Sequence, residues 1–284
     1  MKGIKKLVSA ILCAPLIFAA ACKGGNNKND ASAEKFRFSA DFPDVIEPER
    51  EDITAEYEYD PSLFYGSSYE FRGKLAVLSF GLAAANDGKE NISDFFAAAG
   101  FTDAEYAKAY DETPTENSVA YAFAKKKLGE NNLIAVSVRG FKYDAEWAGN
   151  FNVGKDCRHD GFYAAAGKIY AALGEYLKKH FSDGDKLWIT GYSRGGACAG
   201  ALGTLINDDV DFIVADKKDV FVYTFESPAG APADRNADDR NIFNVTSSAD
   251  AVCLFPPEEY GFKRAGTDID VFSENYKALA ENNG

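Results

Sequence analysis

The sequence predicts an α/β fold with a mostly parallel β-sheet that is covered by helices on both faces. Short runs rich in β-branched and aromatic residues alternate along the chain with longer segments whose apolar residues recur at helical spacing. Such alternation is typical of parallel strands joined by crossover helices. The chain has 284 residues, 46% of them hydrophobic and 14% aromatic, which suffices for one large domain with a buried core.

The first four elements follow from these patterns in chain order. The apolar run KLAVLSFGLA predicts a strand over 74–83, and NISDFFAAAGFTDAEYAKAY predicts a helical segment over 91–110 that Gly100 interrupts. The β-branched run NLIAVSVRG predicts a strand over 132–140. A helix is expected over 161–180, because its apolar residues repeat at helical spacing and basic residues close it, where they suit the helix dipole.

The second half of the chain continues the alternation. KLWIT predicts a strand over 186–190, and a glycine- and alanine-rich helix is expected over 194–207. The runs DVFVYTFE and NIFNVTS predict strands over 219–226 and 241–247. We find no internal repeat and no further domain boundary after about residue 65.

The N-terminus has the pattern of an export signal. The basic stretch MKGIKK precedes the apolar stretch LVSAILCAPLIFA and a run of small residues that ends at Cys22. Residues 1–21 are therefore predicted to be a signal peptide, since the apolar stretch is short for a membrane span and contains Pro15. The ending resembles a bacterial lipoprotein signal, which implies lipidation of Cys22 and anchoring at the cell envelope. The alternative is an ordinary cleaved signal and a secreted protein.

A tether and N-terminal extension are predicted over 22–64, ahead of a domain over 65–284. The polar stretch KGGNNKNDASAE buries nothing and suits a tether. The acidic stretch 41–62 either packs on the domain or stays extended. The formal net charge is −13 and no basic stripe interrupts the sequence, which excludes nucleic acid as a partner.

Three cysteines follow Cys22, namely Cys157, Cys198 and Cys253. An odd number allows at most one disulfide among them. Cys157 with Cys253 is the favoured pair, because Cys198 falls within a predicted buried helix.

The stretch GYSRG places Ser193 between Gly191 and Gly195, directly after the strand predicted over 186–190. In an open α/β sheet the ligand site lies at the carboxyl ends of the strands. Glycines on either side of a serine permit the sharp strand-to-helix turn that exposes a nucleophilic hydroxyl. We therefore interpret Ser193 as a candidate nucleophile.

Four further segments of the sequence carry recognisable motifs. They are VRGFKYDAEWAGNF (138–151), RHDGFYAAA (158–166), TFESPAGAP (224–232) and SADAVCLFPPEEYGFKRAG (248–266). Together with GYSRG, the chain resembles the class 3 (fungal-type) lipase family of α/β-hydrolases from about Asn117 to Phe272. The resemblance implies the α/β-hydrolase fold and hydrolysis of carboxylic esters, with a lipid or ester substrate. We expect no cofactor and no metal ion, and the oligomeric state stays open.

The resemblance also assigns roles residue by residue. Ser193 is the nucleophile and Asp250 is the acid that orients the base. The backbone N–H groups of Arg194 and Phe141 form the oxyanion hole, for which no particular side chain is needed. Phe141 stands where the family usually has Ser or Thr.

The general base departs from the family pattern. The resemblance expects a histidine where this chain has Arg264, and an arginine cannot accept the serine proton. Arg264 is instead expected to pair with Asp250. Of the two histidines in the sequence, His180 is expected at the opposite edge of the sheet, whereas His159 begins the predicted helix 161–180 at the catalytic edge and is a candidate base.

Three hypotheses of function follow, of which the third, an acyltransferase or peptidase acting through the same serine, has no sequence feature of its own. The first is an exported serine hydrolase, lipase- or esterase-like, that forms an acyl-enzyme at Ser193 with His159 or a water as a rearranged base. The second is a catalytically impaired lipase-like lipoprotein that binds a lipid or acyl ligand, with an Arg264–Asp250 pair filling the old site. The serine turn favours the first hypothesis, and the missing histidine favours the second.

Overall fold

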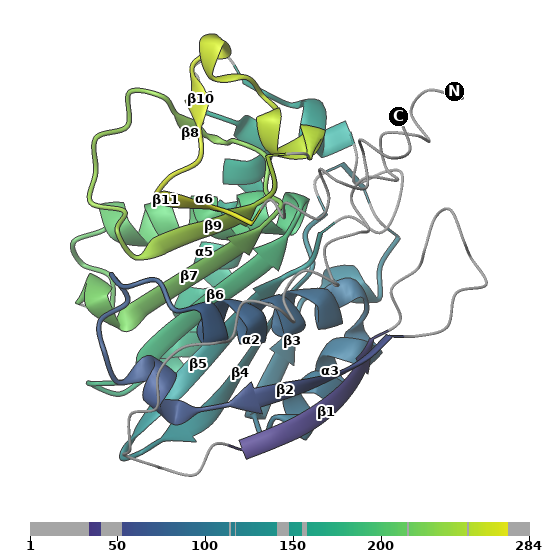
Figure 1. Ribbon diagram of the computed structural model, residues 1–284, viewed down its shortest axis with the longest axis vertical. Helices are drawn as coiled ribbons and strands as arrows, with labels where there is room; N and C mark the ends of the chain where they lie inside the picture. Colours follow the sequence, from purple (N-terminus) through teal and green to yellow (C-terminus); the bar gives the residue numbers. More distant parts are fainter. Residues whose placement is uncertain are drawn as a thin grey trace.

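The computed structural model describes residues 34–40, 53–113, 115–116, 118–140, 148–154, 158–214, 216–248 and 250–271. Within these ranges a twisted central sheet lies between two layers (Figure 1). Helices α2 and α3 and a β-hairpin cover one face, and helices α5 and α6 cover the other. Among the described helices, none has the length and apolar character that a membrane crossing requires.

The described part of the sheet has seven strands in the order β11-β9-β7-β6-β5-β4-β3. Neighbouring strands from β5 to β11 pair in parallel, whereas β4 pairs antiparallel with both β5 and β3. The mostly parallel sheet predicted from the sequence is therefore confirmed. The strands span Thr102–Tyr106 (β3), Tyr121–Leu128 (β4), Asn131–Val138 (β5), Lys186–Tyr192 (β6), Val220–Phe225 (β7), Ile242–Thr246 (β9) and Thr267–Asp270 (β11).

The two sides of the sheet bury different kinds of side chain. Alternate residues of β6 and β7 face opposite layers, so that Trp188 and Phe221 lie on the α2 side and Leu187 and Val222 lie on the α5–α6 side. The helices span Gly73–Ala84 (α2), Lys89–Ala98 (α3), Asp160–His180 (α5) and Arg194–Asp208 (α6). The short strands β8 (Ala231–Pro232) and β10 (Phe262–Lys263) form a separate antiparallel pair.

Two expectations for the first half of the chain are wrong. The run over 74–83, expected as a strand, is helix α2, and the segment 91–110 ends as helix α3 at Ala98 and continues as strand β3. Helix α2 is apolar on most sides because it is buried between the sheet and the hairpin, so its apolar run carries no clear period. Gly81 of α2, for example, lies against the Tyr57 ring of the hairpin.

The hairpin belongs to the same folded unit as the sheet. It consists of β1 (Glu34–Ala40) and β2 (Ile53–Tyr59), which pair antiparallel. The ring of Phe95 on α3 contacts Phe36 and Phe38 at centroid distances of 5.2 and 5.4 Å. Strand β2 leads into the short helix η3 (Pro61–Phe64), where buried Phe64 contacts Trp188. The expected boundary at residue 65 therefore does not coincide with the packing, because 34–40 and 53–64 share the core.

Candidate active site

Ser193 occupies a strained turn between β6 and α6. Its φ of 53° lies in the left-handed region, and its N–H donates to the carbonyl oxygen of Phe225 at 2.8 Å. A Cβ atom at Gly191 would overlap the Gly195 carbonyl group, and one at Gly195 would overlap the backbone of 138–139. The close approach of these backbones explains both glycines and gives the geometry of a nucleophile turn.

Asp250 lies at the same edge of the sheet as Ser193. It follows β9, while Ser193 follows β6, and the carboxyl ends of parallel strands meet at one edge. Its side chain is 5% exposed and its Oδ1 accepts the N–H of Val252 at 2.8 Å, which caps the short helix η8 (Ala251–Leu254). Burial raises the pKa of Asp250 above its ordinary value.

Glu226 is a site residue that the motifs alone did not single out. It follows β7, the strand between β6 and β9, and it is a buried non-glycine residue with a positive φ of 44°. Its Oε2 accepts the N–H of Ser247 and the thiol of Cys253, each at 3.0 Å. Burial raises its pKa as well. The available signal in the sequence was a glutamate where the resembling motif has glycine.

Arg264 does not pair with Asp250, contrary to the expectation. Its Nε and Nη2 donate to Asp268, and its Nη1 donates to the carbonyl oxygens of Ser227 and Cys253. Arg264 stands before β11, whereas Ser193 and Asp250 stand after their strands. Asp268 is four residues away on β11 and half exposed. An ion pair with Asp268 therefore costs less loss of hydration than a pair with the buried Asp250 would.

His159 is a helix-capping residue, which contradicts its expected role as base. It precedes α5, and its Nδ1 accepts the N–H of Phe162 at 3.3 Å. Nε2 therefore carries the proton and donates to the carbonyl oxygen of Asn150 at 3.0 Å. The ring stacks on Phe162 at a centroid distance of 3.6 Å, and burial lowers its pKa. Both ring nitrogens are occupied, so neither can accept the Ser193 proton.

His180 is placed far from this edge. It ends helix α5, whose carboxyl end leads to the start of β6, and its Nδ1 lies 3.4 Å from Nζ of Lys125 on β4. Both histidines of the sequence are thus engaged away from Ser193.

The predicted oxyanion hole is only partly within the described residues. Arg194 begins α6, so its backbone N–H belongs to the first turn, whose N–H groups lack partners within the helix. Its side chain is buried, and its Nε and Nη1 have no hydrogen-bond partner among the described residues. Phe141, Cys22 and Cys157 lie outside the described residues, so the second N–H donor and the lipidation site stay predictions.

The favoured disulfide between Cys157 and Cys253 is wrong. Cys253 is buried and is not part of a disulfide, and Cys198 is buried within α6 and is not part of one either. The Cys253 thiol donates to Glu226, which occupies the thiol within the loop that carries Asp250. The number of cysteines and the predicted helix around Cys198 gave no sign that the Cys253 thiol would bind a carboxylate.

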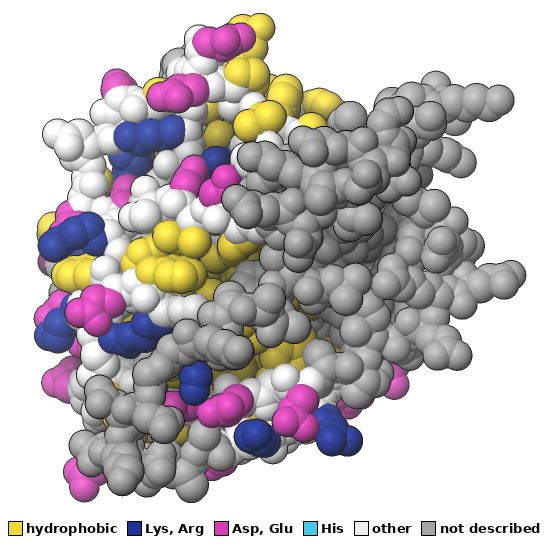
Figure 2. Space-filling model, in the orientation of Figure 1, with side chains coloured by type: hydrophobic (Ala, Val, Ile, Leu, Met, Phe, Trp, Pro, Cys, Tyr) yellow, Lys and Arg dark blue, Asp and Glu magenta, His cyan; other side chains and the backbone are white. Residues whose placement is uncertain are grey.

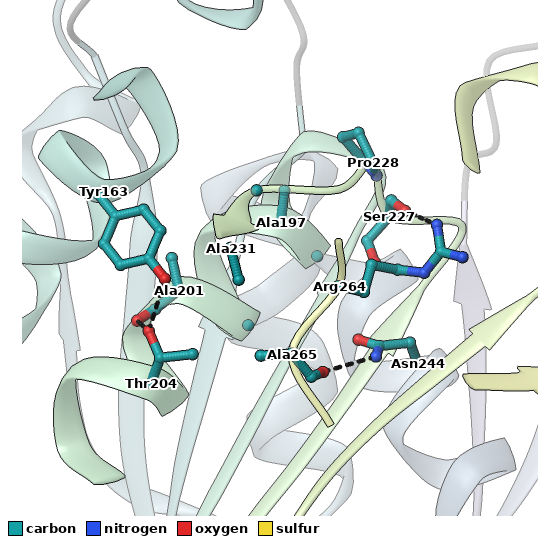
Figure 3. Close-up of a pocket in the computed structure, with 13 residues that line it drawn as sticks. Tyr163, Ala197, Ala201, Thr204, Ser227, Pro228, Ala231, Asn244, Arg264 and Ala265 are labelled. Atoms are coloured by element: carbon teal, nitrogen blue, oxygen red, sulfur yellow. Dashed lines mark hydrogen bonds between the residues drawn. The ribbon is translucent and has the colours of Figure 1, made fainter. Parts of the chain in front are cut away.

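A small pocket lies behind the serine turn (Figure 3). Its lining comes from α6, from the segment 227–231 and from the chain around Arg264, and it includes the side chains of Thr204 and Asn244. These polar groups are already bonded: Tyr163 Oη and Thr204 Oγ1 lie 3.0 Å apart, and Asn244 donates to the Ala265 carbonyl at 2.8 Å. Because these side chains are already hydrogen-bonded within the fold, we assign no chemical step to this pocket.

Large apolar side chains are exposed beside the site. Leu254 and Phe255 follow Asp250 and are 63% and 46% exposed, and Tyr260 is 66% exposed. Figure 2 shows apolar side chains at this end of the molecule, at the top of the view. This surface would suit a ligand with a hydrocarbon chain.

Comparisons with known proteins point to the same fold. Residues 135–260 match the family model described as Lipase (class 3). A triacylglyceride lipase of Rhizomucor miehei aligns with a TM-score of 0.52 at 17% identity, over 71% of this chain and 81% of that one. A triacylglycerol lipase whose catalytic centre is a serine protease triad aligns with a TM-score of 0.53 at 18% identity, over the same shares of the two chains.

One further match is to a longer chain. The Rhizomucor miehei lipase propeptide complex aligns with a TM-score of 0.48 at 18% identity, over 68% of this chain and 66% of that one. No curated protein matches the chain in sequence. The likeness to the lipase structures shows the α/β-hydrolase fold, as the sequence predicted.

Proposed function

We propose that this protein, whose residues 135–260 match the family model described as Lipase (class 3), is a serine hydrolase that cleaves carboxylic esters through an acyl-enzyme at Ser193. The turn around Ser193 carries the proposal. A serine held at positive φ between two tightly packed glycines costs stability, and such strain concentrates at functional sites. Ser193 Oγ would attack the ester carbonyl carbon, the alcohol would leave, and water would hydrolyse the acyl-enzyme.

The proton of Ser193 needs an acceptor other than histidine. Asp250 is buried at the same edge, and its raised pKa makes its carboxylate a stronger base than an exposed aspartate. We infer that a water molecule bonded to Asp250 takes the Ser193 proton and gives one to the Asp250 carboxylate, which returns it through the same water to the leaving alkoxide. A positioned general base contributes roughly 10²- to 10⁴-fold, so a relay of this kind should give slower turnover than an imidazole base.

The substrate class follows from the surface beside the site. Leu254, Phe255 and Tyr260 expose apolar side chains next to the Asp250 loop. This supports an ester with an acyl chain, such as a glycerolipid, rather than a small charged ester.

A second candidate function is binding of a lipid or acyl ligand without turnover. One observation favours it: both histidines are bonded elsewhere, so no imidazole is available to Ser193. The same apolar surface would then serve the ligand alone.

Labelling with a serine-reactive fluorophosphonate separates the two functions. We expect an adduct on Ser193 and turnover of short and long p-nitrophenyl esters, and both should disappear in Ser193→Ala. Ser227→Ala is the matched control, because Ser227 is also buried after a neighbouring strand and bonds only locally. If the parent protein forms no adduct and turns over neither ester, while it binds a radiolabelled fatty acid, the binding function holds instead.

Export and anchoring belong to the same proposal. The signal pattern of residues 1–21 and Cys22 support a lipid anchor at the cell envelope. Growth with a radiolabelled fatty acid should label the parent chain and leave Cys22→Ser unlabelled. Label-free parent protein in the culture medium would indicate an ordinary secreted protein.

A further inference from the structure

Glu226 connects the turn of the nucleophile with the loop of the acid. It directly follows Phe225, whose carbonyl oxygen accepts the Ser193 N–H. The Glu226 N–H donates to the Val245 carbonyl at 3.0 Å, which joins it to the end of β9. Its side-chain oxygen Oε2 then accepts from Ser247 and from Cys253. Phe225 and Glu226 together therefore link the Ser193 turn to the segment that carries Asp250.

The two residues that donate to the Glu226 side chain lie on either side of Asp250 in the sequence. Ser247 lies three residues before Asp250 and Cys253 lies three residues after it. Both donors meet the same carboxylate oxygen, at 3.0 Å each. The loop is thus held at both ends, and between these ends Asp250 accepts the Val252 N–H.

A glutamate at position 226 lowers the stability of the fold in two ways. A φ of 44° favours glycine, and the carboxylate is removed from water beside a second buried carboxylate, that of Asp250. Glycine, which stands here in the resembling motif, would relieve the backbone strain but would leave the Ser247 N–H and the Cys253 thiol without an acceptor. The contribution of Glu226 must therefore come from the contacts of its side chain.

We propose that Glu226 is a positioning residue, which holds Asp250 at a fixed place relative to Ser193 by binding both ends of the Asp250 loop. The catalytic part of this inference rests on the proposed function. The role requires an acceptor oxygen and not a negative charge, because both donors are neutral groups. Burial beside Glu226 raises the pKa of the Cys253 thiol and keeps it protonated as a donor.

Glutamine and glycine substitutions separate the acceptor from the backbone strain. Glu226→Gln keeps an acceptor oxygen at the same reach, whereas Glu226→Gly removes it and relaxes the φ angle. We expect Glu226→Gly to lower kcat by about tenfold or more with KM nearly unchanged, and Glu226→Gln to stay within about threefold of the parent. Asp103→Gly is the matched control, since Asp103 is also an acid at positive φ, but it is exposed and lies on β3.

A double-mutant cycle tests whether Glu226 acts through Asp250. In an Asp250→Ala background, Glu226→Gly should cause no further loss of kcat, because the residue to be positioned is gone. Fully additive losses, or an equal loss in Glu226→Gln and Glu226→Gly, would overturn the proposal.

A readout that does not depend on activity keeps the test decisive. Amide hydrogen exchange at Ser247 and Val252 should accelerate by about tenfold or more in Glu226→Gly and stay unchanged in Glu226→Gln and Asp103→Gly. Unchanged protection in Glu226→Gly would refute the positioning role even in an active enzyme. If the parent neither turns over esters nor reacts at Ser193, the proposed function fails, and the exchange rates still decide what Glu226 does.

Discussion

Arg264 and Asp268 form an ion pair in which Nε and Nη2 of the guanidinium lie 3.0 and 2.6 Å from Oδ2 of the carboxylate. Through Nη1 the same guanidinium binds the carbonyl oxygens of Ser227 and Cys253. Arg264 thus ties the start of β11 to the segments that follow β7 and β9. Arg264 therefore holds these three segments of the chain together, which is a structural role.

Removing this guanidinium should destabilise the protein. We expect Arg264→Ala to lower the free energy of unfolding by about 1–3 kcal/mol, because two partly buried carbonyl groups lose their donor. The measurement is urea denaturation at neutral pH. Arg240→Ala is the control, since its pair with Asp238 is exposed and should change the free energy of unfolding little. Arg264→His should not raise ester turnover, and a clear gain would return this position to the role of the base.

His159 should matter for stability and not for the chemistry. We expect His159→Ala to cost about 1–3 kcal/mol, because α5 loses its cap and Phe162 loses its stacking partner. His159→Asn should recover part of this loss, since asparagine also caps helices. The rate of Ser193 labelling per folded molecule should stay within about twofold of the parent. Loss of labelling in a fully folded His159→Asn variant would make His159 the base after all.

The buried carboxylate of Glu226 predicts a pH dependence with a definite sign. Because its pKa is raised from 4.5, the folded state holds this proton more tightly than the unfolded chain does. Its contribution to stability is therefore fully present below pH 4.5 and is lost as the pH rises through the raised pKa. Glu226→Gln lacks this titration, so its stability relative to the parent should rise over that interval and then level off.

Urea denaturation between pH 4 and 8 measures this difference. Asp238→Asn supplies a flat control, since the Arg240 hydrogen bond lowers the pKa of Asp238 to about 2, below this interval. The stability of Asp238→Asn relative to the parent should therefore stay nearly constant above about pH 5. A stability difference for Glu226→Gln that does not vary with pH would refute a shifted titration at Glu226.

The β1–β2 hairpin should be required for full stability. Phe95→Ala would leave a cavity beneath Phe36, Phe38 and Tyr57, and we expect a loss of about 3–5 kcal/mol. A chain that starts at residue 53 lacks β1 and should also lose stability, whereas a chain that starts at residue 34 should match the parent. Thermal unfolding compares the parent, Phe95→Ala and the two truncated chains. Equal melting temperatures for the two truncated chains would show that the hairpin adds nothing to the fold.

The sequence predicted the second half of the fold better than the first half. The strands near β6, β7 and β9 carry β-branched and aromatic runs, and α5 has one apolar face, so their periods are plain. Helix α2 is buried on both sides, between the sheet and the hairpin that precedes it in the chain, and its apolar run therefore resembled a buried strand. The sequence left open whether the acidic stretch 41–62 packs on the domain, and in the structure β2 packs there within the hairpin.

The sequence by itself predicted the Ser193 turn, because Gly191 and Gly195 lie only four residues apart and approach so closely that a Cβ atom on Gly191 would overlap the Gly195 carbonyl group. The partners of Arg264, His159 and Glu226 were decided by the tertiary structure. Each of these side chains has several donors or acceptors within reach of its length, and only the packed arrangement of distant strand ends selects among them. For Glu226 the selected donors lie 21 and 27 residues further along the chain, a distance at which the order of residues carries no geometry.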